Sequence, residues 1–115
     1  MKETEKLKVK VYNKLVRDRV PEIISSKDGQ PITRKLSKLE FKQELNKKLQ
    51  EEVAEFLADE SMEELADILE VVHGILQSQE KTFDELEKIR LDKKQKRGGF
   101  EKQIFLESVW FSNSI

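Results

Sequence analysis

The chain contains no cysteine, and this absence sets the first limits on its chemistry. Disulfide bonds and thiolate nucleophiles are excluded, and the composition suits a reducing compartment. A zinc site is also disfavoured, because zinc prefers thiolate and imidazole ligands and the only histidine is His73. Magnesium or manganese, which prefer oxygen ligands, fits this composition better than zinc.

Long apolar runs and a marked net charge are also missing. No window approaches the roughly 18 apolar residues that cross a membrane, and the charged start Met1–Lys6 is followed by no apolar run typical of a signal peptide. The formal net charge is only −1, so the chain lacks the excess of basic residues that is typical of nucleic-acid-binding proteins. We therefore expect a soluble, cytoplasmic protein that binds neither membranes nor nucleic-acid polymers.

Charge of both signs is plentiful: charged residues make up 39% of the chain and hydrophobic residues 37%. This balance is typical of amphipathic helices and unfavourable for a large sheet. We expect an all-α fold, a helical bundle built on an antiparallel hairpin of acidic helices, with short extended N- and C-terminal segments. The length of 115 residues predicts a single domain, with its core at about 12–107 and flexible tails at 1–6 and 112–115.

Three capping-box patterns mark the starts of the main helices, since a Ser or Thr followed three positions later by Glu can satisfy free backbone N–H groups. The pairs are Ser37 with Glu40, Ser61 with Glu64, and Thr82 with Glu85. The corresponding helices should end near Ala58, Ser78 and Lys96. Pro21 suits the first turn of a shorter helix that runs through residues 22–26. Residues 7–12 and 100–111 alternate loosely between apolar and polar and should be extended.

Two acidic patterns lie between Leu49 and Val72: Glu51-Glu52-x-x-Glu55 and Glu64-x-x-Asp67. Carboxylates three residues apart share a helix face, and both groups border an apolar stripe. A short loop at residues 59–61 would pack the two helices antiparallel and bring the acids together. Because crowded carboxylates repel one another, this arrangement predicts a hard divalent cation, magnesium or manganese, between them.

Other interpretations of these acids remain open. Glu is a good helix former, so the acids could simply be solvated helix faces. Glu63 competes with Glu64 because it lies four residues before Asp67, and Glu51 could contact a second ion or a water.

Two clusters of basic residues lie outside the acidic helices. One is formed by Lys14, Arg17 and Arg19, and the other by Lys93, Lys94, Lys96 and Arg97. Basic side chains of this kind bind phosphate groups well. The second cluster has an alternative explanation, because cations near a helix C-terminus also oppose the helix dipole.

Three segments, taken together with the acidic patterns, resemble a known family. They are Tyr12-Asn13-Lys14-Leu15-Val16-Arg17-Asp18-Arg19-Val20-Pro21-Glu22-Ile23-Ile24, Glu64-Leu65-Ala66-Asp67-Ile68-Leu69-Glu70-Val71, and Lys93-x-x-Lys96-Arg97-Gly98-Gly99-Phe100. Over residues 12–107 the chain resembles the all-α nucleoside triphosphate pyrophosphohydrolases, the superfamily of MazG, dimeric dUTPases and phosphoribosyl-ATP pyrophosphohydrolase. Within it, the chain is most similar to a small house-cleaning branch.

The resemblance implies a Mg²⁺-dependent enzyme, with Mn²⁺ as a possible substitute. Such an enzyme hydrolyses a nucleoside triphosphate to a monophosphate and pyrophosphate, and it assembles as a homodimer or homotetramer. The implied magnesium ligands are Glu52, Glu55, Glu64 and Asp67. Glu51 or Glu55 would accept the proton of the attacking water, and the implied phosphate contacts are Lys14, Arg17, Lys93, Lys96 and Arg97. Two alternatives are phosphoribosyl-ATP pyrophosphohydrolase-type activity and a non-catalytic helical module that binds nucleotides or other proteins.

Overall fold

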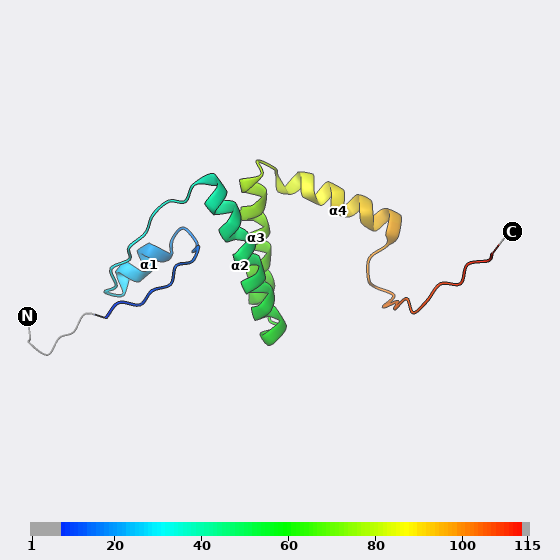
Figure 1. The fold of residues 1–115 in the computed structure, drawn as a ribbon, viewed down its shortest axis with the longest axis horizontal. Coiled ribbons are helices and arrows are strands. Elements are labelled where there is room, and N and C mark those ends of the chain that lie inside the picture. Colours follow the sequence, from blue (N-terminus) through cyan, green and yellow to red (C-terminus); the bar gives the residue numbers. More distant parts are fainter. Residues whose placement is uncertain (1–7, 114–115) are drawn as a thin grey trace, which may run out of the picture. The chain divides into compact units, whose positions relative to one another are not determined.

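A computed structural model of the chain describes residues 8–113 (Figure 1). Within these residues it contains four α-helices and no strand: α1 (Val20–Ser26), α2 (Lys38–Asp59), α3 (Met62–Ser78) and α4 (Phe83–Arg97). The all-α fold class is therefore confirmed, and the segments before α1 and after α4 are non-helical. The tail at 1–6, with residues 114 and 115 of the second tail, lies outside the described residues. None of the described helices has the length and apolar character needed to cross a membrane.

Local capping explains where the main helices begin. At the start of α2, the Ser37 hydroxyl accepts a hydrogen bond from the Glu40 N–H, and the Glu40 carboxylate accepts one from the Ser37 N–H, each at 3.2 Å. The same reciprocal pair opens α4. At α3 the Ser61 hydroxyl caps the N–H of Glu64 at 3.2 Å, but the return bond from the Glu64 side chain is not formed. The Glu64 carboxylate is therefore available for another partner.

The chain forms two compact units that divide between Glu80 and Lys81. In the first unit α2 and α3 lie side by side as an antiparallel hairpin (Figure 1). Their connection is only Glu60 and Ser61, and Glu60 closes α2 in the left-handed conformation, with a φ of 53°. In the second unit Gly98 ends α4, as expected, with a φ of 85° and its N–H bonded to the carbonyl of Lys94.

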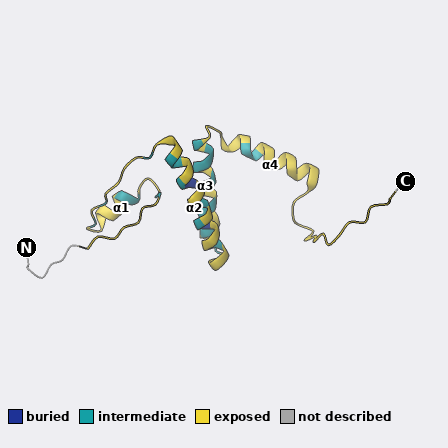
Figure 2. Ribbon diagram, viewed as in Figure 1, coloured by how far each residue is buried: buried dark blue, intermediate teal, exposed yellow. Residues whose placement is uncertain are grey.

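Few of the described residues are buried (Figure 2). Among the described residues the buried ones are Leu45, Val71 and the acidic Glu52. Gly74 explains the close approach of the helices, because a Cβ atom there would lie 2.8 Å from a methyl carbon of Leu45. The seam between α2 and α3 is thus the core of the first unit, and it encloses a carboxylate.

Candidate metal centre

Three of the four predicted metal ligands come together across the seam. Glu52 projects from α2, and Glu64 and Asp67 project from α3, and each can place one carboxylate oxygen within 4.8 Å of the others. The three-residue spacing and the short connection between the helices produce this meeting, as the sequence predicts. Glu63, the alternative to Glu64, is exposed and does not belong to the cluster.

Glu55, the fourth predicted ligand, is exposed but lies beside the same acids. Burial raises the pKa of Glu52, and hydrogen bonding and charge from Glu55 raise it further. Burial also raises the pKa of Glu64, and the negative charge of Glu55 is the next largest cause. Asp67 acts in the same direction on both groups. These shifts show that the carboxylates are crowded enough to oppose one another's ionisation.

Two oxygens in the cluster lack a hydrogen-bond partner although they are buried: Oε2 of Glu52 and Oε2 of Glu64. A buried carboxylate oxygen without a donor or a cation is unfavourable. A solvated helix face does not describe Glu52, since only 7% of this residue is exposed. The two oxygens come from different helices, so a cation between α2 and α3 could satisfy both at once.

Lys48 is a member of this site that the sequence interpretation missed. Its Nζ lies 3.6 Å from Oε1 of Glu52 and 3.5 Å from Oε2 of Glu51, and the side chain is 19% exposed. The spacing of three and four residues to these two acids was the signal that could have identified it. Lys48 supplies part of the positive charge that the crowded acids need.

The first basic cluster lies against the acids. Nη2 of Arg17 is 2.8 Å from Oδ1 of Asp67, and Nζ of Lys14 is 3.7 Å from Oε1 of Glu51. The two ion pairs tie the segment before α1 to both helices of the hairpin. The structure therefore places Lys14 and Arg17 beside the candidate metal ligands, where an anionic ligand of the metal would meet them.

The other three predicted phosphate contacts, Lys93, Lys96 and Arg97, belong to α4 in the second unit. All three side chains are exposed, and Lys96 pairs with Asp92 at 3.1 Å. Their role in binding phosphate stays a prediction.

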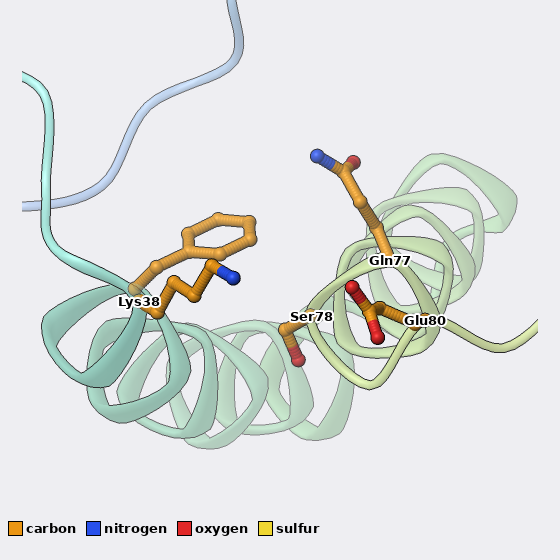
Figure 3. A pocket seen from close by; sticks show the side chains of 5 residues that line it. Lys38, Gln77, Ser78 and Glu80 are labelled. Carbon is orange, nitrogen blue, oxygen red and sulfur yellow. The ribbon is translucent and has the colours of Figure 1, made fainter.

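The hairpin also has a shallow cavity of about 350 Å³ at the end opposite its connecting loop (Figure 3). Its walls come from the start of α2 and the end of α3, with lining residues Lys38, Phe41, Gln77, Ser78 and Glu80. The cavity begins about three helical turns from Glu52 along α2, and none of the clustered acids lines it. It is separate from the candidate metal centre.

Comparisons with protein families, with curated proteins and with solved structures found no match for this chain.

Proposed function

We propose that the chain is a Mg²⁺-dependent nucleoside triphosphate pyrophosphohydrolase, able to use Mn²⁺, that removes altered nucleotides by converting them to monophosphate and pyrophosphate. The observation on which this depends most is the meeting of Glu52, Glu64 and Asp67 at a seam where two carboxylate oxygens are buried without partners. The resemblance of the flanking segments to the all-α pyrophosphohydrolases supplies the reaction.

The residues present fit a hard divalent cation. The donors are all carboxylates, which suits magnesium or manganese better than softer metals. Glu52, Glu64 and Asp67 would hold the ion, with Glu55 beside them as the fourth predicted ligand. A bound ion of this kind neutralises phosphate charge and lowers the pKa of a coordinated water.

Other side chains would act on the substrate directly. Lys14 and Arg17, which now pair with acids, could exchange these partners for the phosphates and stabilise their charge. Glu55 suits the role of proton acceptor for the attacking water, because its carboxylate is exposed beside the cluster. Glu51 is the weaker candidate, since Lys14 and Lys48 both pair with its carboxylate. Lys93, Lys96 and Arg97 would be further phosphate contacts.

We also propose that the enzyme is cytoplasmic and works as a homodimer or homotetramer. Many large apolar side chains are exposed in the single chain, among them Leu57 and Met62 on the hairpin. A small domain buries little apolar surface on its own, and association with further copies buries more of it.

Pyrophosphate release tests the proposed reaction. Purified protein with Mg²⁺ should release pyrophosphate from at least one member of a panel of normal and altered nucleoside triphosphates. Glu52→Gln and Asp67→Asn should each lower the rate at least about 100-fold, because each removes a ligand charge that acts in the transition state. Glu70→Gln is the matched control, because Glu70 is exposed on α3 outside the cluster and should keep its activity.

Other outcomes of the same panel would contradict the proposal. A folded protein that binds nucleotide and Mg²⁺ but never releases pyrophosphate would be a non-catalytic binding module. Turnover of a phosphoribosyl nucleotide alone would indicate phosphoribosyl-ATP pyrophosphohydrolase-type activity.

A further inference from the structure

Two basic side chains from the segment before α1 reach the acids of the hairpin. Nζ of Lys14 lies 3.7 Å from Oε1 of Glu51 on α2. Nη2 of Arg17 donates a hydrogen bond of 2.8 Å to Oδ1 of Asp67 on α3. A run of four residues therefore bridges the two helices beside the candidate metal ligands. We call residues 14–17 the strap.

The clustered acids differ in where their cations come from. Glu52 is paired with Lys48, at 3.6 Å, and Asp67 is paired with Arg17. Oε2 of Glu52 and Oε2 of Glu64 are buried without a hydrogen-bond partner. The two basic side chains thus neutralise only part of the cluster, and the partner of Asp67 comes from outside the hairpin.

Lys48 and Arg17 also differ in how they are held. Lys48 belongs to the same helix as Glu52, one turn away, and its side chain is 19% exposed. The Arg17 side chain is 57% exposed and belongs to a non-helical segment. Because exposed ion pairs contribute little to stability, Arg17 can exchange Asp67 for another partner with little loss to the fold.

The backbone near Arg17 allows this exchange without movement of the strap. The carbonyl of Arg17 accepts a hydrogen bond of 3.0 Å from the N–H of Val20, in the turn that leads into α1. Leu15 and Val16, in the middle of the strap, are half-buried. A change of partner at Asp67 therefore needs only rotation of the Arg17 side chain between staggered conformations.

A divalent cation and Arg17 compete for Asp67. This residue is one of the three acids that can each place one oxygen within 4.8 Å of the others. An ion held there would lie about 2.1 Å from its oxygen ligands. A guanidinium nitrogen 2.8 Å from the same carboxylate would then repel the ion. The Asp67 side chain is 39% exposed, so solvent screens this repulsion only in part.

We infer that Arg17 is a built-in competitor of the metal ion: it neutralises Asp67 in the metal-free protein and is released toward the phosphates of the substrate when the ion binds. The inference rests on the proposed function and concerns the regulation of that same site. Binding free energies are reciprocal, so an anionic ligand that takes Arg17 away from Asp67 strengthens the binding of the ion. The ion and the nucleotide therefore bind with positive coupling.

Calorimetric titration of the full chain with Mn²⁺, without nucleotide, tests the competition. Arg17→Met should lower the Kd for Mn²⁺ at least about 5-fold, the smallest effect typical of coupled sites. Arg19→Met is the matched control, because it removes the same charge two residues away, where Arg19 pairs with Glu22 of α1. This control should bind Mn²⁺ as the wild type does. Circular dichroism checks the fold, and Arg17→Gln decides the question by the same titration if the methionine variant does not fold.

Nuclear magnetic resonance follows the Arg17 side chain directly. Its guanidinium signals, assigned by their loss in Arg17→Met, should show restricted rotation in the metal-free wild type and free rotation at saturating Mg²⁺. Arg17→Met should also raise KM for the nucleotide while it tightens Mn²⁺ binding. A variant that merely loosened the fold would weaken both.

Three results would overturn the inference and leave the metal centre in place. Equal Mn²⁺ affinities of the wild type and Arg17→Met would show that there is no competition. Weaker binding by the variant would show that Arg17 supports the ligand Asp67 from its outer side. A guanidinium that stays paired at saturating Mg²⁺ would show that the ion does not release it.

Failure of the proposed function gives different results. Absence of saturable Mn²⁺ binding in both proteins would contradict the metal centre, and the inference with it. Tighter Mn²⁺ binding by Arg17→Met, in a protein that releases no pyrophosphate from any nucleotide, would support the competition and contradict only the proposed hydrolysis.

Discussion

At the scale of single residues, the unusual feature is a carboxylate in the core. Glu52 lies at the seam between α2 and α3, and only 7% of it is exposed. Lys48 offsets part of its charge from one turn away. Oε2 of the same carboxylate remains without a partner, so the compensation is incomplete. We therefore regard Lys48 as the permanent counter-charge of the site, and the proposed divalent cation would be the second one.

Replacing Lys48 tests this charge balance. Lys48→Met keeps the length of the side chain but leaves Glu51 and Glu52 without their nearby cation, and we expect the free energy of unfolding to fall by about 1–2 kcal/mol in metal-free buffer. Lys47→Met is the control, because among the described residues the Lys47 Nζ pairs with Glu44 alone, at the surface. This substitution should lower the free energy of unfolding by at most about 0.5 kcal/mol. Equal stabilities of the two variants in urea denaturation would show that Lys48 does not balance the buried charge.

At the scale of elements, the capping residue Glu40 at the start of α2 also forms an ion pair, with Arg34. At the start of α2 the hydrogen bond from Arg34 lowers the pKa of Glu40 to about 2, and hydrogen bonds from Ser37 add to the effect. The ordinary pKa of a glutamate side chain is 4.5. A carboxyl group whose pKa is lower in the folded than in the unfolded protein stabilises the folded state. This stabilisation is complete at pH values above the ordinary pKa of the group. This stabilisation is lost as the pH falls from about 4.5 through 2.

Glu40→Gln should remove this pH dependence and little else. Glutamine can still accept the capping hydrogen bond from Ser37, but it has no charge for Arg34. We expect the melting temperature to fall by a few degrees at pH 6, and the difference from the wild type to vanish near pH 2. Thermal unfolding followed by circular dichroism between pH 2 and 7 measures this. Arg34→Met should reproduce the pattern, whereas a difference that is constant over this range would contradict the assignment.

At the scale of the whole molecule, the question is whether the basic end of α4 takes part in the proposed reaction. Each of Lys96→Met and Arg97→Met should raise KM for the nucleotide about 10-fold, since each would remove a charge-assisted hydrogen bond to phosphate. Mn²⁺ affinity should not change, because neither residue belongs to the acidic cluster. Lys88→Met, on the same helix but outside the basic cluster, is the control. Steady-state kinetics that show unchanged KM in both variants would exclude Lys96 and Arg97 from phosphate binding.

Helix boundaries were predictable from the sequence because they depend on residues three apart. The predicted starts at Ser37, Ser61 and Thr82 are confirmed, and the ends agree within one residue. The meeting of the acids also follows from local spacing and a short connection. The sequence could not show that Glu52 is buried while Glu55 is exposed, since this depends on the rotation of α2 against α3.

Long-range contacts were likewise beyond a pattern-based prediction. The ion pair of Arg17 with Asp67 joins residues 50 positions apart, and neither local spacing nor periodicity specifies such a pair. The same holds for the unpartnered oxygens of Glu52 and Glu64, because their burial depends on how α2 and α3 pack against each other.

The most direct test of the central claim is a calorimetric titration of the metal-free protein with Mn²⁺, and then with Mg²⁺. We predict saturable binding of Mn²⁺ to the wild type with a Kd at or below about 1 mM, equivalent to about −4 kcal/mol. Binding should be lost in Glu52→Gln and in Asp67→Asn and kept in Glu70→Gln. No saturable heat with the folded wild type, or equal binding by all three variants, would contradict the claim that these acids form a metal centre.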